Sequence, residues 1–252
     1  MEIFRRLLIT AVLAGLLAGL FVTAVHQIAT VPVILQAEVY EKAADVAAEK
    51  AAPAPSTTPN AADTNMATMS HDAADGHHDH DAAAWEPQNG IERTAFTVVA
   101  DILTGIGFSL LLAAGFAFRG GQMNWRRGLY WGLAGFIVFS LAPGLGLPPE
   151  VPGTAAAPLL QRQIWWVATA LLTGGGLAMI FLGKRTALTV LGIALLVLPH
   201  AYGAPRLAEA HSAAPEALAR QFIVAATMAS LLFWVALGSL TGFFYQRQFK
   251  AG

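Results

Sequence analysis

The chain has 252 residues, of which 56% are hydrophobic and only 12% are charged, and its net charge is −1. Because soluble domains carry roughly 25% charged residues, this composition excludes a soluble globular fold and predicts an integral membrane protein. The small net charge gives no indication of a nucleic-acid-binding surface. Cysteine is absent, so disulfides, thiol catalysis and Fe–S clusters are excluded, and metal ligands must be His, Asp, Glu, Met or backbone oxygen.

Long apolar runs recur along the chain. A bilayer core of about 30 Å requires about 20 apolar residues in a helix. Six runs approach or exceed that length without Lys or Arg: residues 7–28, 95–118, 128–147, 164–182, 186–203 and 222–245. We therefore predict an all-α fold, a polytopic membrane helix bundle with about six transmembrane helices. The run 186–203 is short and contains Pro199, so five spans are the alternative.

The distribution of charge predicts how the bundle is oriented. Nine cationic residues lie in the short segments at one end of the spans, namely Arg5, Arg6, Arg119, Arg126, Arg127, Lys184, Arg185, Arg247 and Lys250. The segments at the opposite end are longer and carry nearly all of the acids. Because short loops rich in Lys and Arg remain in the cytoplasm, both termini are expected there. The first apolar run exceeds that of a signal peptide and lacks a small-x-small cleavage site, which favours a retained helix.

A long polar stretch separates the first two predicted spans. We divide the chain into a first transmembrane helix (1–35), an extracytoplasmic His/Asp-rich loop (36–93) and a five-helix membrane bundle (94–252). Residues 34–50 are rich in Ala and Glu, which predicts that a helix continues beyond the membrane. Residues 51–84 contain few large apolar side chains, so this part of the loop is expected to be disordered.

Small residues recur at helix-packing spacing within the spans. Three pairs of glycines are each four residues apart: Gly15/Gly19, Gly128/Gly132 and Gly238/Gly242. Such pairs let helix backbones approach closely in a membrane. The spacing therefore predicts tight helix packing.

The most concentrated chemical signal is the segment 71–81, which contains four His and four Asp. Its candidate metal ligands are His71, His77, His78, His80, Asp79 and Asp81. Imidazole and carboxylate suit divalent transition ions, and a loop that must become ordered on binding favours capture and delivery over selective storage. The alternative is a solvated acidic linker. Met66 and Met69 lie upstream of this segment. Because thioethers prefer Cu(I), copper is an alternative metal.

Carboxylates also line one face of the predicted helix over residues 34–50. Glu38, Glu41 and Asp45 fall on that face and could attract cations to a pore mouth. The alternative is a solvated face on which Glu38 pairs with Lys42.

Ionisable residues inside the spans are few, and each is a functional hypothesis because burying a charge in lipid is costly. Asp101 is the main candidate for a ligand on an ion path. Its structural alternative is hydrogen bonding to Thr97 or Thr104, or pairing with Arg93. His200 lies in the segment 198–205, where prolines and a glycine predict a broken helix with exposed carbonyls, or else a plain helix end.

Several short segments together resemble the CbtA family of probable cobalt transporter subunits. They are FRRLL at 4–8, AGLLAG at 14–19, AEVYE at 37–41, GIERT at 90–94, LPPE at 147–150, GTA at 153–155, RQIWW at 162–166, LPH at 198–200 and GAP at 203–205. The resemblance implies a bacterial inner-membrane protein that takes up cobalt in connection with cobalamin synthesis. It also implies a small single-span partner, CbtB, with its own His motif. Only the resemblance points to cobalt; the residues themselves leave Ni, Zn and Cu open.

The favoured hypothesis is a metal permease subunit that carries Co²⁺ and holds no tightly bound cofactor. In this hypothesis the His/Asp segment collects the ion, which is then relayed by Glu38, Glu92 or Glu150. Within the bundle the ion is bound by Asp101 and His200. One alternative is a haem-binding or redox subunit with His26 and His200 as axial ligands. Another is a sensor or assembly protein that only buffers metal. Nucleotide-binding, metalloprotease and serine-hydrolase motifs are absent from the sequence, so we do not expect an enzyme.

Overall fold

The computed structural model describes residues 1–51, 87–207 and 212–250. These residues form α1 (Glu2–Ala29), α2 (Val31–Ala51), α3 (Ile91–Arg119), α4 (Trp125–Phe136), the π-helical turn η1 (Ile137–Leu141), α5 (Ala142–Gly146), α6 (Leu159–Leu182), α7 (Thr186–Tyr202) and α8 (Glu216–Lys250). No strand occurs in these three ranges, where β pairing is limited to an isolated bridge between Thr154 and Ser212. The predicted all-α fold is confirmed.

Five helical stretches of the described chain are long and apolar enough to cross a membrane: α1, α3, the continuous α4–η1–α5 unit, α6 and α8. The weakest predicted span corresponds to α7, an apolar helix of 17 residues. At 1.5 Å per residue it is about 25 Å long, slightly less than the bilayer core. The six predicted runs are thus five long spans and one short apolar helix.

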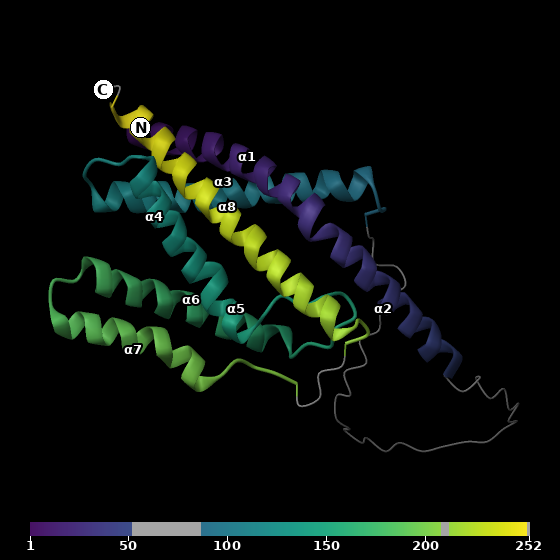
Figure 1. The fold of residues 1–252 in the computed structure, drawn as a ribbon. Coiled ribbons are helices and arrows are strands. Elements are labelled where there is room, and N and C mark those ends of the chain that lie inside the picture. Colours follow the sequence, from purple (N-terminus) through teal and green to yellow (C-terminus); the bar gives the residue numbers. More distant parts are fainter. Residues whose placement is uncertain (52–86, 208–211, 251–252) are drawn as a thin grey trace, which may run out of the picture.

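The two termini lie at the same end of the bundle (Figure 1). Helices α1 and α8 run side by side in opposite directions, and Arg6 Nη1 donates a hydrogen bond to the Gln248 carbonyl at 3.0 Å. Helix α3 packs antiparallel on α1, and α4 packs on α8. Helices α6 and α7 form a hairpin that contacts the rest of the bundle mainly through η1 and α5. The shared end agrees with the prediction that both termini lie on one side.

Glycines make close contacts between α1 and α3 and between α4 and α8, as their spacing predicts. On α1, a Cβ added to Gly19 would lie 2.6 Å from the Ile102 Cα of α3. On α4, a Cβ added to Gly128 would lie 2.8 Å from the Gly242 Cα, and one on Gly238 would lie 2.6 Å from the Gly132 Cα. Because these distances are too short for any side chain, glycine alone permits both crossings.

Helix α2 continues from α1 and extends beyond the bundle (Figure 1). Pro32 lies in its first turn, where the missing N–H costs nothing. Val33 and Ala37 are buried in a small cluster with Val151 and Leu218, and the residues after position 41 are exposed. The predicted helix over 34–50 is confirmed. The adjoining segment 52–86, with the His/Asp tract and both upstream methionines, lies outside the described residues.

A π-helical turn interrupts the span between α4 and α5. The N–H of Ala142 bonds to the Ile137 carbonyl five residues earlier, and Pro143, which has no N–H, follows directly. Such turns are frequent at functional sites. Here the turn places Phe139 and Ser140 on the wall of a cavity.

Candidate functional site

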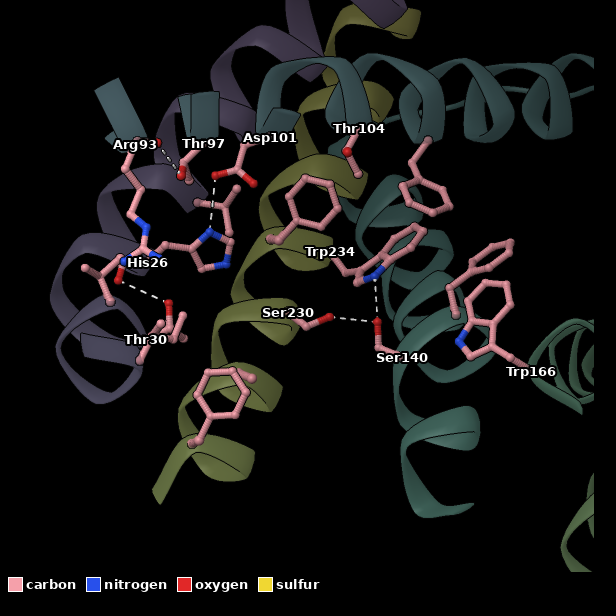
Figure 2. A pocket seen from close by; sticks show the side chains of 18 residues that line it. His26, Thr30, Arg93, Thr97, Asp101, Thr104, Ser140, Trp166, Ser230 and Trp234 are labelled. Carbon is pink, nitrogen blue, oxygen red and sulfur yellow. Dashed lines mark hydrogen bonds and ion pairs between the residues drawn. The ribbon is translucent and has the colours of Figure 1, made fainter. Parts of the chain in front are cut away.

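A cavity of about 580 Å³ lies among α1, α2, α3, α8, η1 and α6 (Figure 2). It occupies the half of the bundle away from the termini, because it is lined by the end of α1, the beginning of α2, the first half of α3 and the first half of α8. Most of its wall is apolar. The polar residues that line it are His26, Thr30, Arg93, Thr97, Asp101, Thr104, Ser140 and Ser230.

Asp101 forms the centre of the polar group in this cavity. Its Oδ2 accepts a hydrogen bond of 2.8 Å from the Thr23 hydroxyl and lies 3.2 Å from Nδ1 of His26. The side chains are 16% exposed for Asp101 and 29% for His26, so the pair is largely shielded but reachable from the cavity. Helix α1 supplies both partners because Gly19, one turn earlier, allows its backbone to touch α3 at Ile102.

The partners predicted for Asp101 from its own helix are wrong. Thr97 donates to the Arg93 carbonyl, and the Arg93 guanidinium forms an ion pair with Glu38 of α2. The prediction considered neighbours within α3, whereas the antiparallel packing of α1 brings Thr23 and His26 to the carboxylate.

Arg93 lines the cavity, and its ion-pair partner is Glu38 of α2, which is not among the lining residues; these two residues are called the rim pair. Nη2 of Arg93 donates to Glu38 Oε1, while Nη1 is buried and has no hydrogen-bond partner. The Glu38 side chain is 15% exposed. The alternative of a solvated face is therefore wrong for Glu38, which is held by α3.

Ser140 joins two helices at the far wall. Its Oγ accepts hydrogen bonds from the Ser230 hydroxyl at 2.7 Å and from Trp234 Nε1 at 3.2 Å (Figure 2). The Trp234 ring stacks on Phe139 with a centroid separation of 5.6 Å. This contact ties the π-helical turn to α8 and forms a partition behind the Asp101 pair.

A second cavity of about 730 Å³ adjoins the first at this partition, and both are lined by Phe139, Ser140 and Ser230. Its other walls are the proline-rich connection after α5 and the first turns of α6. Glu150 lines it and is bound to Arg162 at 2.7 Å. The carboxylate predicted as a relay is therefore paired with an arginine, as Glu38 is.

The half of the bundle near the termini is closely packed. Phe116 is 1% exposed, and its ring makes edge contacts with Trp131 and Tyr245 at centroid distances of 5.4 and 5.5 Å. Leu237 is fully buried in the same cluster. The bundle is thus hollow at one end and filled at the other.

His200 lies apart from the Asp101 pair. It is exposed on α7, its ring meets the edge of Trp165 at 6.0 Å, and it lines neither cavity described above. The predicted break within residues 198–205 begins only after His200, because α7 continues to Tyr202 and ends where Gly203 takes a φ of 92°. Neither of these two cavities is lined by both His26 and His200. They therefore give no support to a haem with these two histidines as axial ligands.

Among the sequence-predicted ligands, Asp101 lines the cavity, and Glu38 is the ion-pair partner of the lining residue Arg93. The described part of the chain contains no group of three or more His, Asp and Glu residues arranged to hold a metal ion. The ligands predicted in the His/Asp tract lie outside the described residues; they are His71, His77, His78, His80, Asp79 and Asp81. The sequence singles out His26 as an ionisable residue near the outer end of the first span, with a haem ligand or an interfacial residue as its interpretations, but it does not predict the pairing with Asp101.

The fold and the cavity define a polytopic helical membrane protein with a carboxylate–imidazole pair inside its apolar bundle. The chain belongs to the CbtA family, described as probable cobalt transporter subunits, whose model matches residues 4–246 of 252. The predicted family is confirmed. No curated protein and no solved structure matches the chain.

Proposed function

We propose that this subunit takes up Co²⁺ across the bacterial inner membrane and that Asp101 and His26 bind the ion during passage. The observation that carries the proposal is their 3.2 Å contact inside a cavity of an apolar bundle. An ionisable pair at that depth is costly, so its presence favours a role in an ion path. Carboxylate oxygen and imidazole nitrogen suit divalent transition ions such as Co²⁺.

The proposed site is suited to transient binding. The pair supplies two side-chain ligands, which leaves other coordination positions to water or to nearby hydroxyl groups such as Thr23 and Thr30. A transport site must bind strongly enough to admit an ion and weakly enough to release it. The packed half of the bundle near the termini lies beyond the site, so release towards the cytoplasm requires a rearrangement there.

The His/Asp tract is proposed to capture the ion before it reaches the cavity. The tract follows α2 in the chain, and α2 carries Glu38, which pairs with the cavity residue Arg93. Glu92 and Glu150 remain proposed relay residues, and His200 a further proposed ligand. Because the family describes a subunit, we propose that the partner is a small single-span protein of the CbtB type with its own His motif.

Replacing His71, His77, His78 and His80 together by alanine tests the capture step. Uptake by cells that carry only this variant should fall several-fold at limiting cobalt and approach the wild-type rate at saturating cobalt, because the tract raises the local ion concentration. Cobalt accumulation measured over a concentration series checks this. Replacement of Met66 and Met69 is the matched control and should leave cobalt uptake unchanged. Equal uptake by wild type and the four-histidine variant at every concentration would contradict the capture role.

A further inference from the structure

The cavity that contains Asp101 is larger than a bare ion requires. Six waters at about 30 Å³ each give a hydrated ion of roughly 180 Å³, against a cavity of about 580 Å³. Its aromatic lining residues are Phe108, Phe139, Trp166, Phe222, Phe233 and Trp234. Ion filters are narrow rings of polar groups, whereas sites for organic ligands are apolar cavities of about 300–1,000 Å³ with a few placed polar groups. The cavity therefore resembles a site for an organic ligand more than an ion filter.

The polar groups of the cavity include a cation as well as the Asp101 pair. Arg93, Thr97 and Asp101 follow one another at four-residue spacing and therefore share one face of α3. At 1.5 Å per residue, the backbone positions of Arg93 and Asp101 are about 12 Å apart. The Glu38 carboxylate offsets the charge of this guanidinium, but the remaining N–H groups of Arg93 can still donate to an anionic group.

The Arg93 guanidinium retains unused capacity for such an anion. Of its five N–H donors, the bond to Glu38 engages Nη2, and Nη1 is buried without a partner. A buried donor without a partner is unfavourable, and the Arg93 side chain, which is 34% exposed, lines the cavity. A carboxylate that approached Arg93 would pair it through charge-assisted hydrogen bonds, for which the planar guanidinium is well suited.

We propose that the cavity takes cobalt as a chelate with a small organic acid rather than as the hydrated ion alone. In this arrangement Asp101 and His26 contact the metal, a carboxylate of the chelate pairs with Arg93, and the carbon skeleton lies on the aromatic wall. The proposal rests on the proposed function, because it names the form in which the same site receives its substrate.

Binding to the purified full-length protein tests this inference. The four tract histidines are replaced by alanine so that they do not compete, and Co²⁺ alone, citrate alone and an equimolar Co²⁺–citrate complex are each titrated by calorimetry. We expect the cobalt–citrate complex to bind about tenfold more tightly than Co²⁺, the size of one additional charge-assisted contact. The variant Glu38→Gln/Arg93→Gln removes both charges of the rim pair together. For this variant, the ratio of the affinity for cobalt–citrate to the affinity for Co²⁺ should fall to about one.

The matched control is Glu216→Gln/Arg220→Gln, an exposed ion pair on α8, which should keep the wild-type ratio. Equal affinity of the parent protein for Co²⁺ and for cobalt–citrate would overturn the inference. So would a rim variant that keeps the wild-type ratio, or citrate alone binding as tightly as the complex. Asp101→Asn distinguishes failure of this inference from failure of the proposed function. If this variant binds both Co²⁺ and cobalt–citrate as tightly as the parent protein, the proposed function itself fails, whatever the rim variant does.

Discussion

Replacing Gly128 by valine is expected to prevent stable packing of α4 on α8. A Cβ at this position would lie 2.8 Å from the Gly242 Cα, so the obstacle is backbone that cannot rotate away. Overpacking a core that can adjust costs about 1–3 kcal/mol. Here the two helices must separate, and the loss should reach or exceed the upper end of that range. Thermal unfolding and the yield of monodisperse protein in detergent measure the effect.

Gly107→Val is the matched control for this substitution. Gly107 lies within α3, and no atom lies within 4 Å of a Cβ added there. This variant should unfold within a few degrees of the wild type, because a valine on an open face of a helix displaces nothing. If both variants unfolded at the same temperature, the close approach of α4 and α8 would be wrong.

Asp101→Asn is expected to weaken cobalt binding by roughly 100-fold, since an amide keeps the shape of the side chain but removes the charge that attracts a dication. The asparagine oxygen can still accept the hydrogen bond from Thr23, so the fold should persist. Equilibrium dialysis of cobalt against protein lacking the tract histidines measures the change, with thermal unfolding as the check on folding.

The control for Asp101 is Asp45→Asn, the same substitution at an exposed position of α2. It should leave the cobalt affinity of the tract-free protein unchanged. Comparable loss in both variants would indicate a non-specific electrostatic effect, and an affinity within twofold of wild type for Asp101→Asn would remove the carboxylate from the site.

The sequence predicts the spans because lipid imposes length and apolarity on every helix that crosses it. The sequence also predicts close packing at Gly128 and Gly238. Each is followed four residues later by a second glycine, and two glycines at this spacing give a helix a face without side chains. It does not predict that α4 pairs with α8, because a small-residue face fits any other such face. The π-helical turn at Ile137–Leu141 was also missed, although Pro143, three residues after the polar Ser140 within a span, was a signal for it.

The site was predicted in part. Asp101 stands out because a charge within an apolar run is rare, and Glu38 because it follows a helical periodicity. Their partners, His26 and Arg93, come from other helices, so local spacing could not reveal them. His200 drew attention through its neighbouring prolines, yet a proline close to a helix end only limits the length of that helix.

We propose that this chain moves cobalt through the cavity that holds Asp101. The most direct measurement is cobalt flux into proteoliposomes that contain the protein together with its small partner subunit, with Ni, Zn and Cu tested in parallel. We expect the wild type to accumulate cobalt above the level of protein-free liposomes and Asp101→Asn to lose this accumulation. Flux equal to that of protein-free liposomes, or undiminished flux in Asp101→Asn, would contradict it.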